Sequence, residues 1–184
     1  MHFRVMTKPD ISDQLLPFEE IFEQVRGYSP DEEQLLHVYR QAAIDAAERI
    51  SNRAIGLQTV VATFEHYRHR TYLPYGEIKT VERVEAFNVD GDLVLIEPTL
   101  YTVNQASNEI ILNRKLSNYK DFQVTYQVGY EVFEVPAVMK VGMLKLISTW
   151  FDAGREDVAL GVSVSEIPMN HKACFELYRI APSL

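Results

Sequence analysis

Apolar positions near the start of the chain recur with the spacing of a helix. In the segment LLPFEEIFEQVRG, Pro17 occupies a favoured first helical position and Gly27 supplies a stop. Four apolar side chains between them fall on one helix face: Phe18, Ile21, Phe22 and Val25. The pattern predicts a short amphipathic helix over about residues 17–26.

A second, longer helix is predicted over about residues 30–54, with Gly56 as its stop. It begins at Ser29 and Glu32, which have the spacing of a capping box. The inward stripe of this helix is predicted to consist of apolar residues, half of them alanines: Leu35, Val38, Tyr39, Ala42, Ala43, Ala46, Ala47 and Ile50. Small side chains on the stripe would let a neighbouring helix or sheet approach closely.

Between residues 57 and 130 the chain is rich in Val, Ile, Thr, Tyr and Phe, which is typical of strands. Asp90-Gly91 is a hairpin signal, and a second reversal is predicted around residues 104–108. Glu97-Pro98 and residues 114–121 read as loops. We therefore expect an antiparallel sheet of about five to seven strands.

A third helix is predicted over residues 136–153, and it is apolar on almost every side. Lys140, Lys145 and Asp152 alone mark a solvent-facing side. A helix of this kind must be buried on most faces, either by the chain's own sheet and alanine-rich helix or by a partner. After it, residues 158–168 read as a loop, and a short helix is predicted from Pro168 to about Tyr178. The fold class expected is α+β, with helices packed on an antiparallel sheet in a single domain.

The overall composition is that of one ordinary globular domain: 184 residues, 47% hydrophobic and 24% charged. The formal net charge of −8 weighs against a nucleic-acid binder, because such proteins use Lys and Arg to neutralise phosphates. Cys174 is the single cysteine, so no internal disulfide can form. There is no secretion signal and no apolar run of roughly 18 residues, so we expect no membrane insertion.

The sequence offers weak candidates for chemistry. The histidines considered for a metal or acid–base site are His37, His66, His69 and His171. On a single strand, residues three apart such as His66 and His69 would point to opposite faces and could not chelate one ion. Cys174 lies among apolar residues, which is typical of a small buried hydrophobe.

Carboxylate groups occur at residues 19–20, 31–33 and 156–157, but the first two fall in first turns of predicted helices, where negative charge is favourable. No phosphate-binding loop, nucleophile elbow or metal-binding helix motif is present in the sequence. The segment HYRHRTYLPY could stack on single-stranded nucleic acid, but with this net charge an interface rich in Tyr and Arg is favoured. We expect no enzyme and no catalytic, cofactor-binding or metal-ligating residue.

Four segments, in this order, resemble the head-tail connector (adaptor) proteins of tailed bacteriophages. They are EEQLLHVYRQAAIDAAERISNRAIG, YLPYGEIKTVERVEAFNVDGDLVLIEPTLYTV, FQVTYQVGYEVFEVPAVMKVGMLKLISTWFDAGRE and IPMNHKACFELYRI. The resemblance extends from about Phe18 to Ile180.

The resemblance implies a non-enzymatic structural protein of the virion neck, assembled in the host cytoplasm. It implies a homo-oligomeric ring of about twelve copies beneath the portal protein, joining the DNA-filled capsid to the tail. The same ring would contact a stopper, tail-completion or tail-terminator protein, and genomic DNA would pass through its lumen without specific binding. An acidic chain suits that lumen, because a basic one would hold the phosphates.

The resemblance also implies a division of the chain into a connector core over residues 1–164 and a C-terminal docking helix and tail over residues 165–184. The family's C-terminal segment docks onto the portal. Carried over to this sequence, the docking residues are Phe175, Leu177, Tyr178 and Ile180.

Two alternatives remain open. The first is a small monomeric hydrolase or ligand-binding α+β domain, which would show a deep pocket lined by perturbed carboxylates. The second is another ring of the same neck, such as a stopper or tail-terminator, which would share these features except the contact with the portal.

Overall fold

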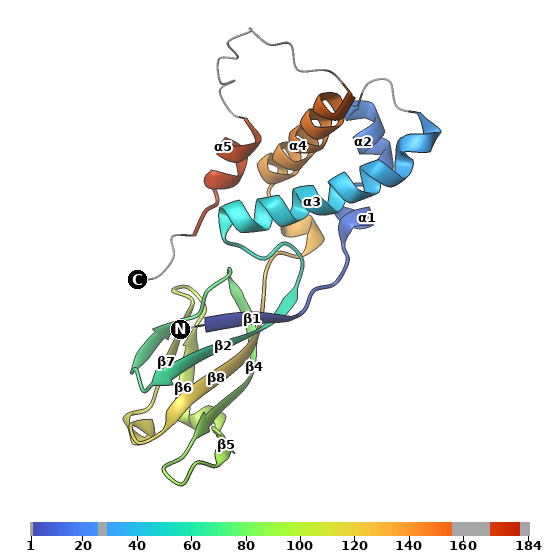
Figure 1. The fold of residues 1–184 in the computed structure, drawn as a ribbon. Coiled ribbons are helices and arrows are strands. Elements are labelled where there is room, and N and C mark those ends of the chain that lie inside the picture. Colours follow the sequence, from blue (N-terminus) through green and yellow to red (C-terminus); the bar gives the residue numbers. More distant parts are fainter. Residues whose placement is uncertain (1, 26–28, 156–169, 181–184) are drawn as a thin grey trace, which may run out of the picture. The chain divides into compact units, whose positions relative to one another are not determined.

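The computed structural model describes residues 2–25, 29–155 and 170–180 (Figure 1). The described elements fall into two compact units. The β unit comprises residues 2–9 and 56–130, and the helical unit comprises residues 10–55 and 131–180 without the undescribed stretches. The predicted α+β class is confirmed.

The β unit contains two sheets in which every strand pair is antiparallel, as predicted. The five-stranded sheet has the order β1 (His2–Thr7), β2 (Gln58–His66), β8 (Lys120–Val128), β4 (Ile78–Phe87) and β5 (Leu93–Leu95). The second sheet has the order β3 (Arg70–Tyr72), β7 (Glu109–Leu112) and β6 (Tyr101–Asn104). The sequence predicted a single sheet and did not predict β1.

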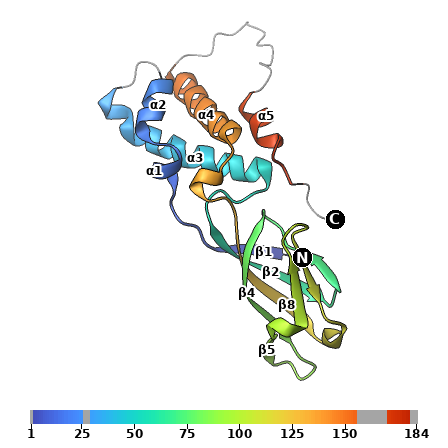
Figure 2. The same cartoon turned by 180° about the vertical axis from the view of Figure 1, so that it is seen from behind.

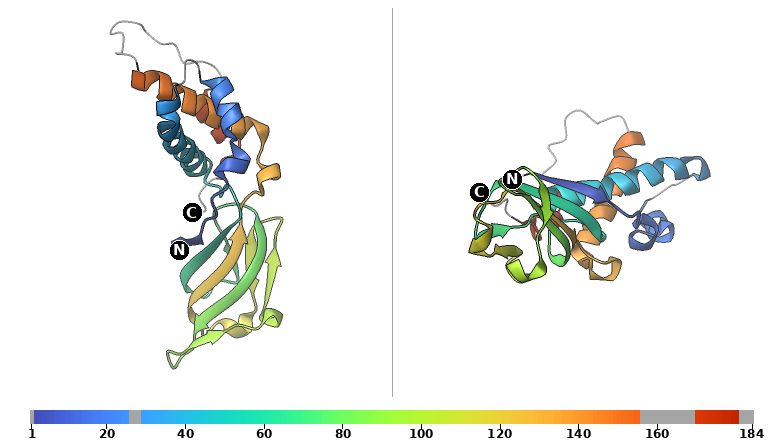
Figure 3. Two further views of the ribbon diagram at one scale, coloured as in Figure 1. Left: turned by 90° about the vertical axis from the view of Figure 1, so that its right-hand side faces the viewer. Right: turned by 90° about the horizontal axis from the view of Figure 1, so that it is seen from below.

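The strands of the two sheets surround a shared interior, which is visible in the view from below in Figure 3. Alternate residues of β2 are buried, as expected for a strand with one face toward a core. Phe64 of β2 stacks on Phe122 of β8 with ring centroids 5.3 Å apart. The hydroxyl of the buried Tyr126 donates a 2.8 Å hydrogen bond to the carbonyl of Pro74, and burial raises the pKa of Tyr126.

One predicted strand is divided in two. The segment TVVATFEHYRHRTYL forms β2 and β3, which belong to different sheets. At the break, the amide of Leu112 donates to the carbonyl of His69, and the Tyr67 hydroxyl donates to the carbonyl of Leu112. These bonds hold the turn against β7, so the chain changes sheet within a segment whose composition predicted strand throughout.

Both predicted hairpins are confirmed. In the β4–β5 hairpin, the Asn88 side-chain oxygen accepts from the amides of Asp90 and Asp92, and Gly91 has φ +87°. A positive φ is easily adopted by glycine, which has no Cβ. The second hairpin joins β6 and β7. The predicted loops contain two 3-10 turns, Pro98–Leu100 and Arg114–Leu116.

The helical unit contains the predicted helices and one additional short helix, α1. Its elements are α1 (Ser12–Leu15), α2 (Phe18–Gln24), a 3-10 turn (Pro30–Glu32), α3 (Glu33–Ser51), a 3-10 turn (Val132–Glu134), α4 (Ala137–Arg155) and α5 (His171–Glu176). The predicted capping box of Ser29 and Glu32 is present. However, α3 ends at Asn52 in the left-handed conformation, φ 54°, and not at Gly56, because asparagine also tolerates that conformation.

The helix α4 lies among α2, α3 and α5 (Figure 2). Five of its large apolar side chains are buried: Met139, Met143, Leu146, Ile147 and Phe151. At Gly142 a Cβ atom would lie 2.7 Å from Cε1 of Phe175 and 2.8 Å from Cβ of Cys174. Glycine therefore allows α5 to pack directly on α4. The apolar sides of α4 are covered largely by the chain's own helices, so this helix requires no partner.

No helix of the described residues is long and apolar enough to cross a bilayer. The predicted domain boundary at residue 164 and the predicted helix start at Pro168 lie outside the described residues. Within them, α5 begins at His171, and the Asn170 side chain caps it by accepting from the amide of Ala173.

Candidate interaction surfaces

The helix α3 carries two apolar stripes side by side. The inner stripe is buried and contains four apolar residues and three polar ones: Leu36, Ala43, Ile44 and Ala47, with Arg40, Glu48 and Ser51. The outer stripe includes Leu35 and Val38, which belong to the predicted inward stripe but are 42% and 59% exposed. That prediction was wrong at these two positions, because the apolar arc of α3 is wider than the neighbouring helices cover. Tyr39, at the edge of this outer stripe, contacts Trp150 of α4 at a ring-centroid distance of 5.8 Å.

Arg40 is a buried charge that the sequence pattern did not reveal. Its guanidinium forms a 2.6 Å ion pair with Asp13 of α1 and lies 4.3 Å from the ring centroid of Phe18 in α2. It also donates to the carbonyl of Leu16 at 3.4 Å. Because these contacts link α1, α2 and α3, Arg40 has a structural role within the helical unit.

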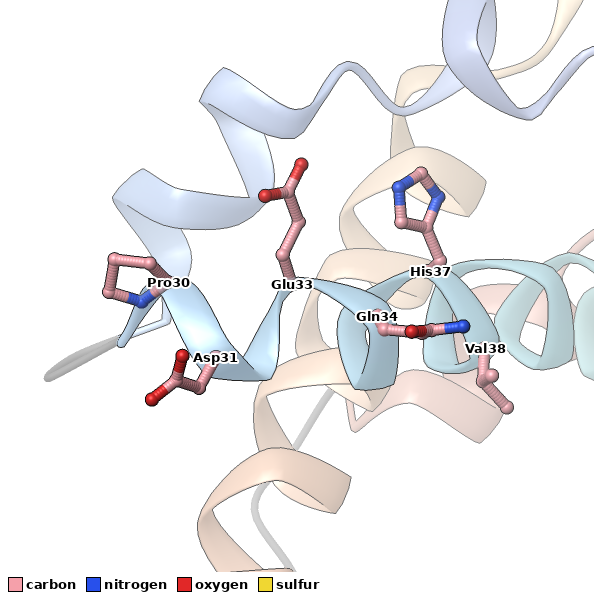
Figure 4. Close-up of a pocket in the computed structure, with 6 residues that line it drawn as sticks. All are labelled: Pro30, Asp31, Glu33, Gln34, His37 and Val38. Carbon is pink, nitrogen blue, oxygen red and sulfur yellow. The ribbon is translucent and has the colours of Figure 1, made fainter.

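A shallow depression of about 590 Å³ lies at the start of α3 (Figure 4). It is lined by Pro30, Asp31, Glu33, Gln34, His37 and Val38. Glu33 and His37 project to one side of the helix and Val38 to the other (Figure 4). Since these side chains diverge, the depression does not hold a set of groups directed at one ligand atom.

The histidines considered for chemistry are divided between the units. His66 ends β2 and is exposed, and His69 lies in the following turn with Nδ1 2.9 Å from the carbonyl oxygen of Leu112. His37 packs edge-on against Phe18, and His171 starts α5. No cluster of three or more His, Cys, Asp or Glu suited to a metal ion occurs within residues 2–25, 29–155 and 170–180.

Two of the carboxylates considered for catalysis, Glu20 and Glu32, have structural partners. Glu20 forms a 2.7 Å ion pair with Lys140, and Glu32 closes the capping box. Glu156 and Asp157 lie outside the described residues. Asp10, which the sequence did not single out, accepts from the amide of Ser12 and from Gln41, and these hydrogen bonds lower its pKa to about 2.

The predicted docking residues differ in their surroundings. Phe175 is fully buried against α4, whereas Leu177 is 63% exposed. The segment after them is held at the end of α3 by three hydrogen bonds. Arg53 donates to the carbonyl of Tyr178 at 2.6 Å, the amide of Ile180 donates to Ser51 at 2.9 Å, and Asn52 donates to Ile180 at 3.4 Å. Leu177 is thus the predicted docking residue most available to a partner.

Phe133 is an exposed aromatic side chain in the helical unit that the sequence analysis missed. It lies in the 3-10 turn before α4 and is 81% exposed. The turn is held by Glu131 and Glu134 in a capping box. Aromatic side chains that become buried in an interface carry much of its binding energy. The sequence signal for an exposed Phe133 was its position between two glutamates, shortly before Pro136.

Further exposed apolar side chains lie in the β unit at the two ends of the five-stranded sheet. On β1 these are Phe3 and Met6, and on the β4–β5 hairpin they are Val89, Leu93 and Leu95. Within the described residues, β1 and β5 each pair with one strand only. Each therefore presents a free backbone edge beside exposed apolar side chains.

The fold is similar to that of chains in solved structures of gene transfer agent (GTA) particles. The neck of an empty GTA particle computed with C6 symmetry matches with a TM-score of 0.73 at 16% sequence identity, covering 100% of this chain and 98% of that chain. A native GTA virion and the neck of a native particle computed with C12 symmetry match with TM-scores of 0.72 and 0.71, both at 15% identity and the same coverage. No protein-family model and no curated protein matches the sequence.

Proposed function

We propose that this chain is a structural protein of the neck of a tailed-phage-like particle, where copies of it form a ring. The observation that carries the proposal is the likeness of the fold to chains of GTA neck structures. The likeness covers 100% of this chain and 98% of each of those chains. One of those necks was computed with C12 symmetry, which is compatible with a ring of about twelve copies.

The exposed surfaces support a ring. A closed ring needs two different surfaces on each copy, one for each neighbour. The helical unit presents the outer stripe of α3, Phe133 and Leu177, and the β unit presents both edges of its larger sheet. Isolated exposed apolar residues are normal on proteins, but aromatic and aliphatic anchors on several elements are typical of a subunit with several neighbours.

The specific role that we propose is that of the adaptor. The ring would bind the portal protein on one side and a stopper, tail-completion or tail-terminator protein on the other. Its lumen would pass genomic DNA without gripping it, in keeping with the net charge of −8. No chemical step is assigned to any residue.

We propose that the C-terminal segment docks onto the portal through Leu177, with Tyr178 and Ile180 beside it. Phe175 contributes indirectly, because its buried ring fixes α5 on α4. An exposed leucine next to a backbone segment held by three hydrogen bonds is a preorganised anchor, which reduces the entropy lost on binding.

The test is native mass measurement of the full chain alone and mixed with its portal protein. We expect a complex of portal with many copies of this chain. The substitution Leu177→Asp, at an exposed position, should leave a folded helical unit that no longer joins the portal. Lys172→Gln, at an exposed position of the same helix, is the matched control and should bind normally.

A chain that stays monomeric with its portal at every concentration would contradict the neck assignment and favour a solitary ligand-binding domain. Normal portal binding by Leu177→Asp would contradict only the docking segment. The first result tests whether the chain is a neck protein, and the second tests where it attaches to the portal.

A further inference from the structure

The five-stranded sheet ends on two strands of opposite character. Within the described residues, β1 is hydrogen-bonded only to β2, and β5 only to β4. Because they are the first and last strands of one sheet, their free edges face away from each other. Two different surfaces on opposite sides of a subunit are what a head-to-tail ring contact requires.

β1 is poorly protected for a strand. Five of its six residues are exposed, so both faces of the strand meet solvent. Its apolar residues include Phe3, which is 42% exposed although its ring lies 5.2 Å from that of Tyr75. Exposed edge strands tend to pair with another chain unless something blocks them. No proline and no acidic residue interrupts residues 2–8.

β5 presents the complementary edge. Leu95 is 64% exposed, and Val89 at the tip of the hairpin is 78% exposed. Residues 88–97 carry three carboxylates, Asp90, Asp92 and Glu97, and no basic residue. By contrast, residues 2–8 carry His2, Arg4 and Lys8. The two edges therefore have opposite charge, and each would repel a second copy of itself.

The two faces of the sheet also match across such a contact. Phe3 and Val5 stand opposite Ala62 and Val60 of β2, which are buried, so they lie on the inner face. On β5 the inner residue is Val94, which stands opposite the buried Ala86. A sheet continued from β1 to β5 of the next copy would place Phe3 and Val5 beside Val94.

The outer face completes the match. Arg4 stands opposite Val61 of β2 on the outer face, and Leu95 stands opposite Glu85 of β4 on the same face. The aliphatic stem of an arginine covers apolar surface while its guanidinium reaches a carboxylate. Arg4 could thus lie over Leu95 and reach Glu97 of the neighbour.

From these observations we propose that copies of this chain join head to tail by pairing β1 of one copy with β5 of the next, so that the five-stranded sheet continues from subunit to subunit. The inference rests on the proposed ring and identifies the surfaces that close it. Backbone hydrogen bonds supply the attraction, and the opposite charges fix the direction.

The experiment is cysteine cross-linking of the full chain. Arg4→Cys and Leu95→Cys place thiols on the same sheet face at opposite edges, and the native Cys174 is buried. A short bis-maleimide tolerates a shift of two residues in register, at about 3.3 Å per residue, because such a shift keeps both thiols on the same face. The double variant R4C/L95C should give a covalent ladder to trimers and beyond, and a mixture of the two single variants should give dimers.

The controls fix the meaning of the ladder. R4C alone and L95C alone should give no efficient dimer, because each edge meets its opposite. R4C/D152C has the second thiol at an exposed site of α4, in the helical unit, and should give no ladder. The charge pairing is tested in a mixture of His2→Cys and L95C variants. Adding Arg4→Glu to the His2→Cys variant should lower the yield of cross-linked dimer about tenfold. Adding Glu97→Arg to the L95C variant should then restore that yield.

The outcomes are separable. A ring seen by native mass without a ladder would overturn the edge pairing and leave the neck assignment intact. Efficient dimers of R4C alone would show a two-fold contact and also overturn it. A chain that is monomeric by native mass, with portal and without it, and gives no ladder would overturn both.

Discussion

α4 and β1 are both partly apolar segments, but the chain covers one of them and leaves the other bare. α4 contacts α2, α3 and α5 of its own unit, and five of its large apolar side chains are buried. β1 is bonded along one edge and exposed on both faces. The comparison shows that the amount of apolar sequence does not identify an interface. A segment becomes a candidate interface when the other elements of the same chain leave it uncovered.

The largest expected effect is on the covered segment. Gly142→Val would insert side-chain atoms where even a Cβ lies 2.7 Å from Phe175. We expect a loss of about 1–3 kcal/mol in the free energy of unfolding by overpacking, which outweighs the gain of up to about 1 kcal/mol from removing a helical glycine. Urea unfolding measures it. Val141→Ala, at the exposed neighbouring position, should stay within about 0.5 kcal/mol, and equal values for the two variants would show that α5 does not rest on Gly142.

The bare segment should behave in the opposite way. Phe3→Ser should change the free energy of unfolding of the isolated chain by less than about 1 kcal/mol, because the side chain is already partly hydrated. The same substitution should weaken self-association, measured by sedimentation. A large loss of stability without any loss of association would mean that β1 serves its own sheet and not a neighbour.

The smallest expected effect concerns the segment between β1 and α1. The pKa of Asp10 is lowered from its ordinary value of 3.8 to about 2. At pH values above this ordinary pKa, the ionised carboxylate contributes its full stabilisation of the helical unit. That contribution should be lost as the pH falls from about 4 to about 2. Because Asp10 is solvent-exposed, the effect should be small. The difference in acid unfolding between wild type and Asp10→Asn measures it, and an unchanged difference across this range would contradict the role of the two hydrogen bonds.

The elements that the sequence predicted are those with strong local signals. The capping box at Ser29, the apolar periodicity of α4 and the hairpin at Asp90-Gly91 each depend on residues a few positions apart. β1 was missed because a six-residue strand has too little pattern to be recognised, and its partner β2 lies more than fifty residues away.

The candidate surfaces were less predictable for a related physical reason. Periodicity shows that α3 has a wide apolar arc, but it cannot show which part a neighbouring helix covers, so Leu35 and Val38 were assigned inward. Arg40 was invisible, since its partner Asp13 and the ring of Phe18 come from other helices. Phe175 and Leu177 are two residues apart, and only the tertiary structure distinguishes the buried one from the exposed one.

The order of the chain through the two units has a consequence for its synthesis. α3 leaves the ribosome about a hundred residues before α4, and β1 emerges long before β2 and β8, whereas residues 56–130 form an uninterrupted run of seven strands. Contacts between distant segments close slowly, because their loop entropy must be overcome first. The central run can therefore acquire its shape on the nascent chain, while the helices that flank it in sequence wait for translation to finish.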